Sequence, residues 1–192
     1  MNDFSKQPDV AKAGGLILPY KGKWPTIGKD VFIAPNATVI GDVIIGDGSS
    51  VWFNTLIRGD DHWIKIGSRT NIQDGTIVHI SKGTAPTTIG SDITIGHGAI
   101  IHGCVLEDRC LIGIGAIVLD GVVVETGSVV AAGAVVPPGK RIKSGEVWAG
   151  CPAKPIRSVR PDDLKYIDED AVLYRALASD YLKMRRALVS GL

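Results

Sequence analysis

Three of the four histidines have the spacing of a possible metal site. The stretch IGHGAIIHG, residues 95–103, carries His97 and His102 among Ile, Ala and Gly, and His79 follows Val78 earlier in the chain. Neutral imidazole is the commonest protein metal ligand. Three histidines with an open fourth position form a catalytic zinc site, and Fe²⁺ or Co²⁺ would also suit imidazole. Two histidines are too few to hold a catalytic metal, so the fold must bring a third histidine to the other two.

An apolar anchor residue recurs every six positions through most of the chain. The period runs without a break from Leu106 to Trp148 and from Ile27 to Ile57, and it resumes at Ile66 after three extra residues and at Ile89 after five. A period of six is neither helical nor simple strand alternation. It indicates a short strand and a turn, with the anchor and the residue four later pointing inward. Three such units close a triangular coil, and coils stack by parallel pairing at about 4.8 Å.

This pattern resembles the hexapeptide-repeat proteins over roughly residues 25–155. We predict a mainly β fold, a left-handed parallel β-helix of about seven coils with a C-terminal α-helix; the left hand comes from the resemblance, because the general crossover rule gives a right hand. Residues 1–23 are assigned to an N-terminal extension, 24–157 to the β-helix and 158–192 to a helix that packs on it. Pro161 and two acids favour a helix start, and the amphipathic helix within this segment is predicted to cover about 162–189. Its expected apolar positions are Leu164, Ile167, Tyr174, Leu177, Ala178, Tyr181, Leu182 and Met184.

The repeat assigns each histidine a face and a height. His79 and His102 each directly follow an anchor of the first face, one coil apart, so we expect their side chains within about 5 Å. His97 lies two residues after an anchor of the third face, around a corner from the pair. A neighbouring copy would supply it if the first face of one chain packed against the third face of the next. That heterologous contact, repeated three times, closes a threefold ring.

A second polar pair predicts the same packing. Arg58 lies on the first face one coil below His79, and Asp74 lies on the third face one coil below His97. A salt bridge between Arg58 and Asp74 across the interface would fix the register of the trimer.

Several motifs resemble the γ-class carbonic anhydrases and their bacterial relatives. They are RGD at 58–60, NIQDG at 71–75, IGHGAIIHGC at 95–104, LIGIGAIVLDG at 111–121 and GCPAKPIR at 150–157. The resemblance implies a homotrimer in which His79 and His102 of one chain and His97 of the next hold Zn²⁺, with Fe²⁺ or Co²⁺ as alternatives. It implies a lyase that hydrates CO₂ to bicarbonate through a metal-bound hydroxide, available near neutral pH because the metal lowers the pKa of its water.

The resemblance also implies roles for further residues. Gln73 lies beside the metal-bound water, Asn71 orders that region, Tyr174 approaches the site, and the interface is organised by Arg58, Asp60 and Asp74. No other cofactor-binding residue is implied. The proton carrier departs from the family pattern, because the loop ISKGTAPTTIG (80–90) has no acid and Asp61 replaces a glutamate. Fast CO₂ hydration therefore does not follow from the resemblance, although Asp61 remains a candidate proton carrier.

Composition restricts the partners. The chain has 192 residues, 45% of them apolar, and a net charge of +1 without a basic run, which argues against nucleic acid or an anionic membrane as a partner. The N-terminus is polar and no apolar run approaches the ~20 residues of a membrane span, so we expect a cytoplasmic protein.

Three alternatives stay open beside the lyase. A hexapeptide acyltransferase would use acetyl-CoA, but that class usually has one catalytic histidine, and the sequence has no obvious cluster for CoA phosphates. A thioester hydrolase is a nearby variant with the same metal site. A catalytically weak, metal-binding accessory trimer is compatible with the incomplete proton path.

Overall fold

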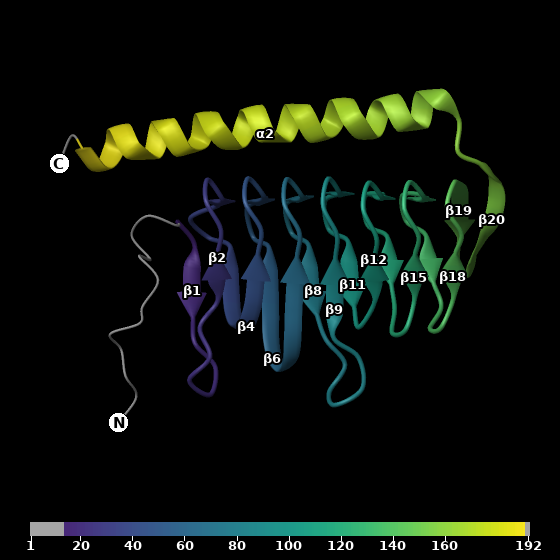
Figure 1. Cartoon of the computed structure of the whole chain (residues 1–192), viewed down its shortest axis with the longest axis horizontal. Coiled ribbons are helices and arrows are strands. Elements are labelled where there is room, and N and C mark those ends of the chain that lie inside the picture. Colours follow the sequence, from purple (N-terminus) through teal and green to yellow (C-terminus); the bar gives the residue numbers. More distant parts are fainter. Residues whose placement is uncertain (1–13, 191–192) are drawn as a thin grey trace.

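The computed structural model describes residues 14–190, without the side chains of 188–190, and is a parallel β-solenoid of about seven turns with a single C-terminal helix (Figure 1). The predicted mainly β fold is confirmed. Two sheets carry the strands, and the first sheet bends around a corner through the long strands β4 (Thr38–Ile45) and β6 (Leu56–Ile66). The solenoid therefore has three faces.

Each face is a stack of short parallel strands. Face one comprises β1 (Leu16–Leu18), the first halves of β4 and β6, β8 (Ile77–His79), β11 (Ile100–His102), β14 (Ile117–Val118) and β17 (Val135–Val136). Face two comprises β2 (Thr26–Ile27), the second halves of β4 and β6, β9 (Thr87–Ile89), β12 (Val105–Leu106), β15 (Val123–Val124) and β18 (Arg141–Ile142). Face three comprises β3 (Phe32–Ile33), β5 (Ser50–Val51), β7 (Asn71–Ile72), β10 (Thr94–Ile95), β13 (Leu111–Ile112), β16 (Val129–Val130) and β19 (Glu146–Gly150).

The anchors form the core, as the repeat predicts. Ile57, Val78 and Ile101 stack on face one and are completely buried. The fourth position after an anchor is also buried along most of the solenoid. Val105 departs from this rule, because the repeat there is one residue short and the preceding Cys104 points inward instead.

The two ends of the solenoid differ from regular coils. Strand β1 lies within residues 1–23, which we assigned to an extension, yet it pairs in parallel with β4 and extends face one. Ile27 follows Ile17 by ten positions instead of six, because a turn closed by Tyr20 and Lys23 is inserted there, so the period of six does not reveal β1. At the other end, β20 (Ala153–Ser158) pairs antiparallel with β19.

Helix α2 (Pro161–Ser190) runs back along the solenoid from the β20 end to the β1 end (Figure 1). It contacts β3, β5, β7 and β10, so it covers face three. Ile167, Ala171 and Ala178 are buried, whereas Leu164, Leu177 and Met184 are 39%, 38% and 54% exposed although we expected them on the packed side. The rings that the helix contacts set its rotation: Tyr181 packs within 6 Å of Phe32, Trp52 and Phe53, ring centre to ring centre. In the part of the chain that the structure describes, no helix is long and apolar enough to cross a membrane.

The start of α2 is fixed by polar contacts. Pro161 occupies the first helical position, and the backbone N–H of Arg160 donates to the Asp163 carboxylate at 2.7 Å. Arg157 donates to the same carboxylate at 2.5 and 2.9 Å. The hydrogen bond from Arg157 is the main reason why the pKa of Asp163 falls to about 2.

Candidate metal centre

The structure places His79 and His102 together on face one. Strands β8 and β11 pair in parallel with His102 opposite His79, as the repeat predicts. The Nδ1 atom of His79 and the Nε2 atom of His102 are 3.2 Å apart. Two nitrogens bound to one tetrahedral zinc at about 2.0–2.1 Å lie about 3.3 Å from each other. The pair therefore fits two ligands of one tetrahedral metal ion.

A carboxylate holds the second nitrogen of each imidazole. Asp60 Oδ1 lies 3.1 Å from His79 Nε2, and Asp120 Oδ1 lies 2.5 Å from His102 Nδ1. Histidines that bind metals in proteins are almost always held by such an outer partner, which fixes the tautomer and the ring orientation. Both the spacing of the two imidazoles and their hydrogen-bond partners are therefore typical of metal ligands.

Neighbouring donors keep both carboxylates ionised. Burial raises the pKa of Asp60, but hydrogen bonds from His79, from the next backbone N–H and from Arg58 outweigh burial and lower the pKa below its ordinary value. Burial likewise raises the pKa of Asp120, and hydrogen bonds from His102 and Ser81 lower it overall. Arg58 is itself ion-paired with Asp60.

His97 lies apart from the pair, at the corner that follows face three. Its Nδ1 is 2.9 Å from Asp74 Oδ2, and its Nε2 is 3.4 Å from the Tyr174 hydroxyl. The side chain of His97 is 44% exposed. Within residues 14–190, no three His, Cys, Asp or Glu side chains of the single chain are grouped to hold a metal. Within the described residues, the chain by itself therefore does not complete a three-histidine site around the pair.

A polar network runs under α2 to Gln73. Gln73 Nε2 donates to Asn71 Oδ1 at 3.2 Å, and Asn71 Nδ2 donates to Thr94 Oγ1 at 2.8 Å. Thr94 in turn hydrogen-bonds to the carboxylate of Asp170 on the helix. All three solenoid side chains are buried, and α2 contacts the strands β7 and β10 that carry Asn71 and Thr94. The network fixes the Gln73 amide at the edge of the helix, on the same side of the chain as His97.

Tyr174 and Asp170 border a groove between face three and α2. The groove has a volume of about 310 Å³, and its polar lining residues are Gln73, Thr94, His97, Tyr166, Asp170 and Tyr174. Burial, helped by the charges of Asp170 and Asp74, raises the pKa of the Tyr174 hydroxyl to about 12. Burial also raises the pKa of Asp170, whose Oδ2 is buried without a hydrogen-bond partner among the described residues. Tyr174 thus stays protonated and can donate a hydrogen bond.

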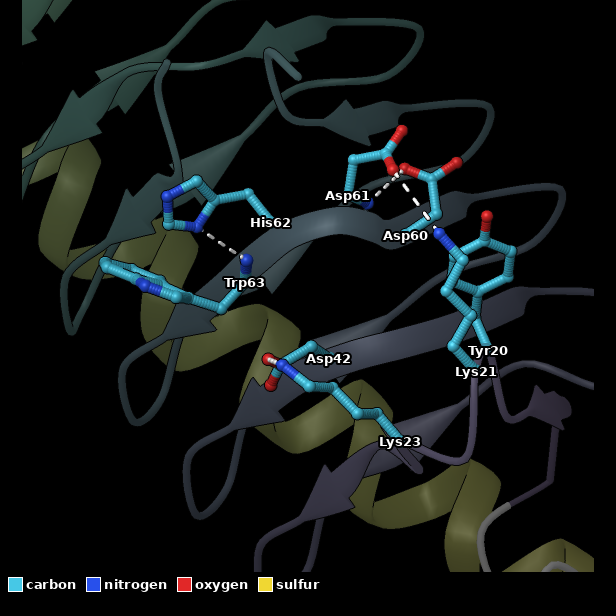
Figure 2. A pocket seen from close by; sticks show the side chains of 8 residues that line it. All are labelled: Tyr20, Lys21, Lys23, Asp42, Asp60, Asp61, His62 and Trp63. Carbon is cyan, nitrogen blue, oxygen red and sulfur yellow. Dashed lines mark hydrogen bonds and ion pairs between the residues drawn. The ribbon is translucent and has the colours of Figure 1, made fainter. Parts of the chain in front are cut away.

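Asp61 lines a cavity of about 420 Å³ together with Asp60, Lys21 and His62 (Figure 2). Its backbone N–H donates to Asp60 Oδ1 at 3.0 Å, and its exposed carboxylate lies 3.9 Å from Lys21 Nζ. The fourth histidine, His62, is at the far end of the cavity, where its Nδ1 accepts the backbone N–H of Trp63 at 2.9 Å. Asp61 therefore reaches solvent and contacts the pair only through Asp60.

The interface that we expected between face one and face three needs a correction. Helix α2 covers face three of its own chain, so two copies do not pack flat face against flat face there. The corner with His97 and Asp74 stays accessible beside the helix, since both side chains are more than a third exposed. Arg58 and Asp74 are on different faces, bound to Asp60 and His97 respectively, and their predicted contact between chains stays a prediction.

Sequence reasoning missed Asp120 and Asp170. The repeat carried a signal for Asp120, which is the second residue after the anchor Val118, one coil above His102 at the corner that follows face one. Asp170 had no such signal, because its position depends on how the helix is rotated on the solenoid.

Comparison with known proteins identifies the family. Residues 25–59 match the bacterial transferase hexapeptide (six repeats) family. Over 161 residues, 81% of this chain, the sequence is 51% identical to "Gamma carbonic anhydrase 2, mitochondrial" of Arabidopsis thaliana, of whose length the chain spans 58%. Over 152 residues, 79% of this chain and 95% of the relative, it is 53% identical to a "Probable carbonic anhydrase" of Methanocaldococcus jannaschii.

A solved structure has the same fold as this chain over nearly the whole length of the solved protein. The crystal structure of a hexapeptide transferase family protein from Anaplasma phagocytophilum is 44% identical, with a TM-score of 0.83 over 86% of this chain and 98% of that one. Identity above 50% over almost the full length of the archaeal relative is sufficient to assign the family. The chain belongs to the γ-carbonic anhydrase-like family of hexapeptide-repeat proteins.

Proposed function

We propose that this protein is a metal-dependent carbonic anhydrase-like lyase that hydrates CO₂ to bicarbonate at sites shared between three copies of the chain. The observation that carries the proposal is the histidine pair: two imidazole nitrogens 3.2 Å apart, each ring held by a carboxylate. His79 and His102 of one copy and His97 of the next would hold the metal, with Zn²⁺ as the first candidate and Fe²⁺ or Co²⁺ as alternatives.

The outer surface of face one supports an interface between copies. The residues before each anchor point outward there, and in five successive coils they are apolar: Leu56, Ile77, Ile100, Ile117 and Val135. Ile77 is 41% exposed. The equivalent ladder on face two includes Lys65 and Arg141, which suit solvent. An apolar ladder beside the histidine pair is what a contact with the His97 corner of another copy needs.

A metal in this site would lower the pKa of a coordinated water to about 7 and so supply hydroxide near neutral pH. The residues of this chain orient the reactants around it. Gln73, fixed through Asn71 and Thr94, presents its amide on the His97 side of the site. Tyr174 keeps its hydroxyl proton and can donate it in a hydrogen bond. The apolar part of the groove suits CO₂, which has no charge.

Hydration of CO₂ by water yields bicarbonate and one proton, and that proton must reach solvent. Asp61, exposed and joined to Asp60 by a backbone hydrogen bond, is the carrier that the chain offers. The loop of residues 81–86 contributes no acid. We therefore expect turnover limited by proton transfer and accelerated by small diffusible buffers.

The test is metal content and CO₂ hydration of the full chain purified anaerobically with Zn²⁺, Co²⁺ or Fe²⁺. We expect one metal per chain, a trimer, and hydration that a chelator abolishes. His102→Ala should lose both the metal and the activity. His62→Ala, which removes the histidine outside the site, is the matched control and should keep both.

Other outcomes contradict the proposal in distinct ways. A trimer that binds no divalent metal refutes the site. A metal-loaded trimer without hydration refutes the lyase and favours the accessory role. Tight acetyl-CoA binding in the absence of metal favours an acyltransferase.

A further inference from the structure

Asp120 links the histidine pair to a neighbouring loop. It lies in the turn between β14 and β15, one coil above His102. Its Oδ1 is 2.5 Å from His102 Nδ1, and its Oδ2 accepts a hydrogen bond from the Ser81 hydroxyl at 2.9 Å. The two oxygens of one carboxylate therefore bind a candidate metal ligand and the first residue of the inserted loop 81–86.

That loop is closed on itself and anchored at both ends. Its first residue pairs with Ala85, with the Ser81 N–H donating to the Ala85 carbonyl at 2.9 Å. Just after the loop, the Thr87 hydroxyl donates to the His79 carbonyl at 2.5 Å and accepts the Gly103 N–H at 3.0 Å. Hydrogen bonds thus join the 81–86 loop to Asp120 and to both strands that carry the histidines, β8 and β11.

Gly103 leaves room for this contact. A Cβ atom on Gly103 would lie 2.6 Å from Asp120 Oδ1, closer than real Cβ contacts occur. The backbone directly after His102 is thus packed under the carboxylate. A side chain at this position would press on the Asp120 carboxylate without removing it, and it would also strain the backbone, because Gly103 has a φ of +53°.

We propose that Asp120 is a positioning residue that holds the His102 imidazole with its proton on Nδ1 and its Nε2 directed at His79, and that Ser81 ties the 81–86 loop to this orientation. A carboxylate can only accept at Nδ1, so it selects the tautomer whose Nε2 lone pair is available to a metal. The metal part of this inference rests on the proposed function. The tautomer and ring orientation do not.

The first experiment reads the tautomer in the metal-free full chain by nitrogen-15 NMR of the imidazoles. Wild-type His102 should carry its proton on Nδ1, and Asp120→Ala should abolish that preference. Asp120→Asn keeps an oxygen acceptor and should retain it. Asp108→Asn is the matched control: Asp108 is also the second residue after an anchor, but on another corner, where it accepts the Ser91 N–H at 2.8 Å.

The second experiment measures the Co²⁺ dissociation constant by competition with a chromophoric chelator. Asp120→Ala should weaken Co²⁺ binding by about 10- to 100-fold, the usual effect of losing an outer partner. Asp120→Asn, which keeps the orientation but loses the charge, should fall between wild type and Asp120→Ala. Gly103→Ala should weaken binding too, Ser81→Ala less, and Asp108→Asn should match wild type.

The outcomes separate this inference from the proposed function. If wild type binds no Co²⁺ but Asp120→Ala changes the tautomer, the proposed metal site fails and the positioning role stands. If Asp120→Ala leaves the His102 tautomer unchanged, the positioning role is refuted whatever the metal does. Equal loss of Co²⁺ affinity in Asp120→Ala and Asp108→Asn would also refute it, because the effect would then be general to the stacked coils.

Discussion

Gly96 is the glycine at which a single methyl group should disturb the coil stacking next to His97. Its backbone φ is not positive, so conformation alone does not require glycine. A Cβ atom there would lie 2.7 Å from Ile114 N and 2.9 Å from Gly113 C in the next coil. Ordinary contact begins near 3.4 Å, so the two coils must separate by roughly 0.5–0.7 Å. The Gly96 N–H to Ile112 carbonyl hydrogen bond, now 2.8 Å, would stretch toward the limit of a hydrogen bond.

We expect Gly96→Ala to lower the free energy of unfolding by about 2–4 kcal/mol, the sum of ~1–3 kcal/mol for overpacking and ~1 kcal/mol for the weakened hydrogen bond. Gly98 is the matched control in the same motif. It has a φ of +66° but open space where an added methyl group would lie, so Gly98→Ala should cost only the left-handed strain of about 1–2 kcal/mol. Gly98→Asn should cost less, since Asn54 occupies the equivalent turn position with a φ of 59°.

The assay is urea unfolding followed by circular dichroism, with midpoints compared at unchanged denaturant slope. The order of stability should be wild type, Gly98→Asn, Gly98→Ala and then Gly96→Ala. If Gly96→Ala were as stable as Gly98→Ala, the close approach of the coils at this corner would not constrain the residue at position 96.

Three further predictions concern helix docking, the core and pH. Tyr181→Ala should remove the ring contacts of α2 with Phe32 and Phe53, leave Tyr174 as its contact on Trp52, and cost about 2–4 kcal/mol, with faster proteolysis of the helix; Leu177→Ala, 38% exposed on the same helix, should cost under ~1 kcal/mol. Ile101→Ala, at a completely buried anchor in β11 directly before His102, should lower the free energy of unfolding by about 2–5 kcal/mol, and a cost below ~1 kcal/mol would contradict the packed core. The pKa of Asp163 is lowered to about 2 from 3.8, so its contribution to stability is present above about pH 4 and is lost as pH falls toward 2; Asp163→Asn should flatten that part of the acid-unfolding curve, whereas an unchanged curve would rule out the Arg157 contact as its origin.

The period of six predicted the part of the site that lies on the solenoid. Because stacked coils repeat the same register, counting from an anchor placed His79 opposite His102 and separated His97 from both. The same counting could have found Asp120. Counting from an anchor assigns each residue a height and a face, but it does not say which side chains hydrogen-bond to each other. The carboxylates that hold the His79 and His102 imidazoles were therefore found only in the structure.

The contribution of α2 could not be predicted in the same way. The sequence indicated a helix, but its apolar residues are distributed around too much of the circumference to select one side. The rotation of α2 is fixed by Tyr181, which packs on aromatic rings far from the helix in the sequence: Phe32, Trp52 and Phe53. That rotation brings Tyr174 to His97 and Asp170 to Thr94, and it covers the face that the sequence had left for a neighbouring copy.

We propose that each metal site is built from two chains, and mixing two inactive variants tests this arrangement. His97→Ala and His102→Ala chains, each expected to bind no metal tightly alone, are unfolded together and refolded as mixed trimers. In a mixed ring, a His97→Ala chain supplies an intact His79 and His102 pair to a neighbour that still carries His97, so we predict recovery of Co²⁺ binding in part of the sites. Verified mixed trimers that recover no Co²⁺ binding would contradict the shared site.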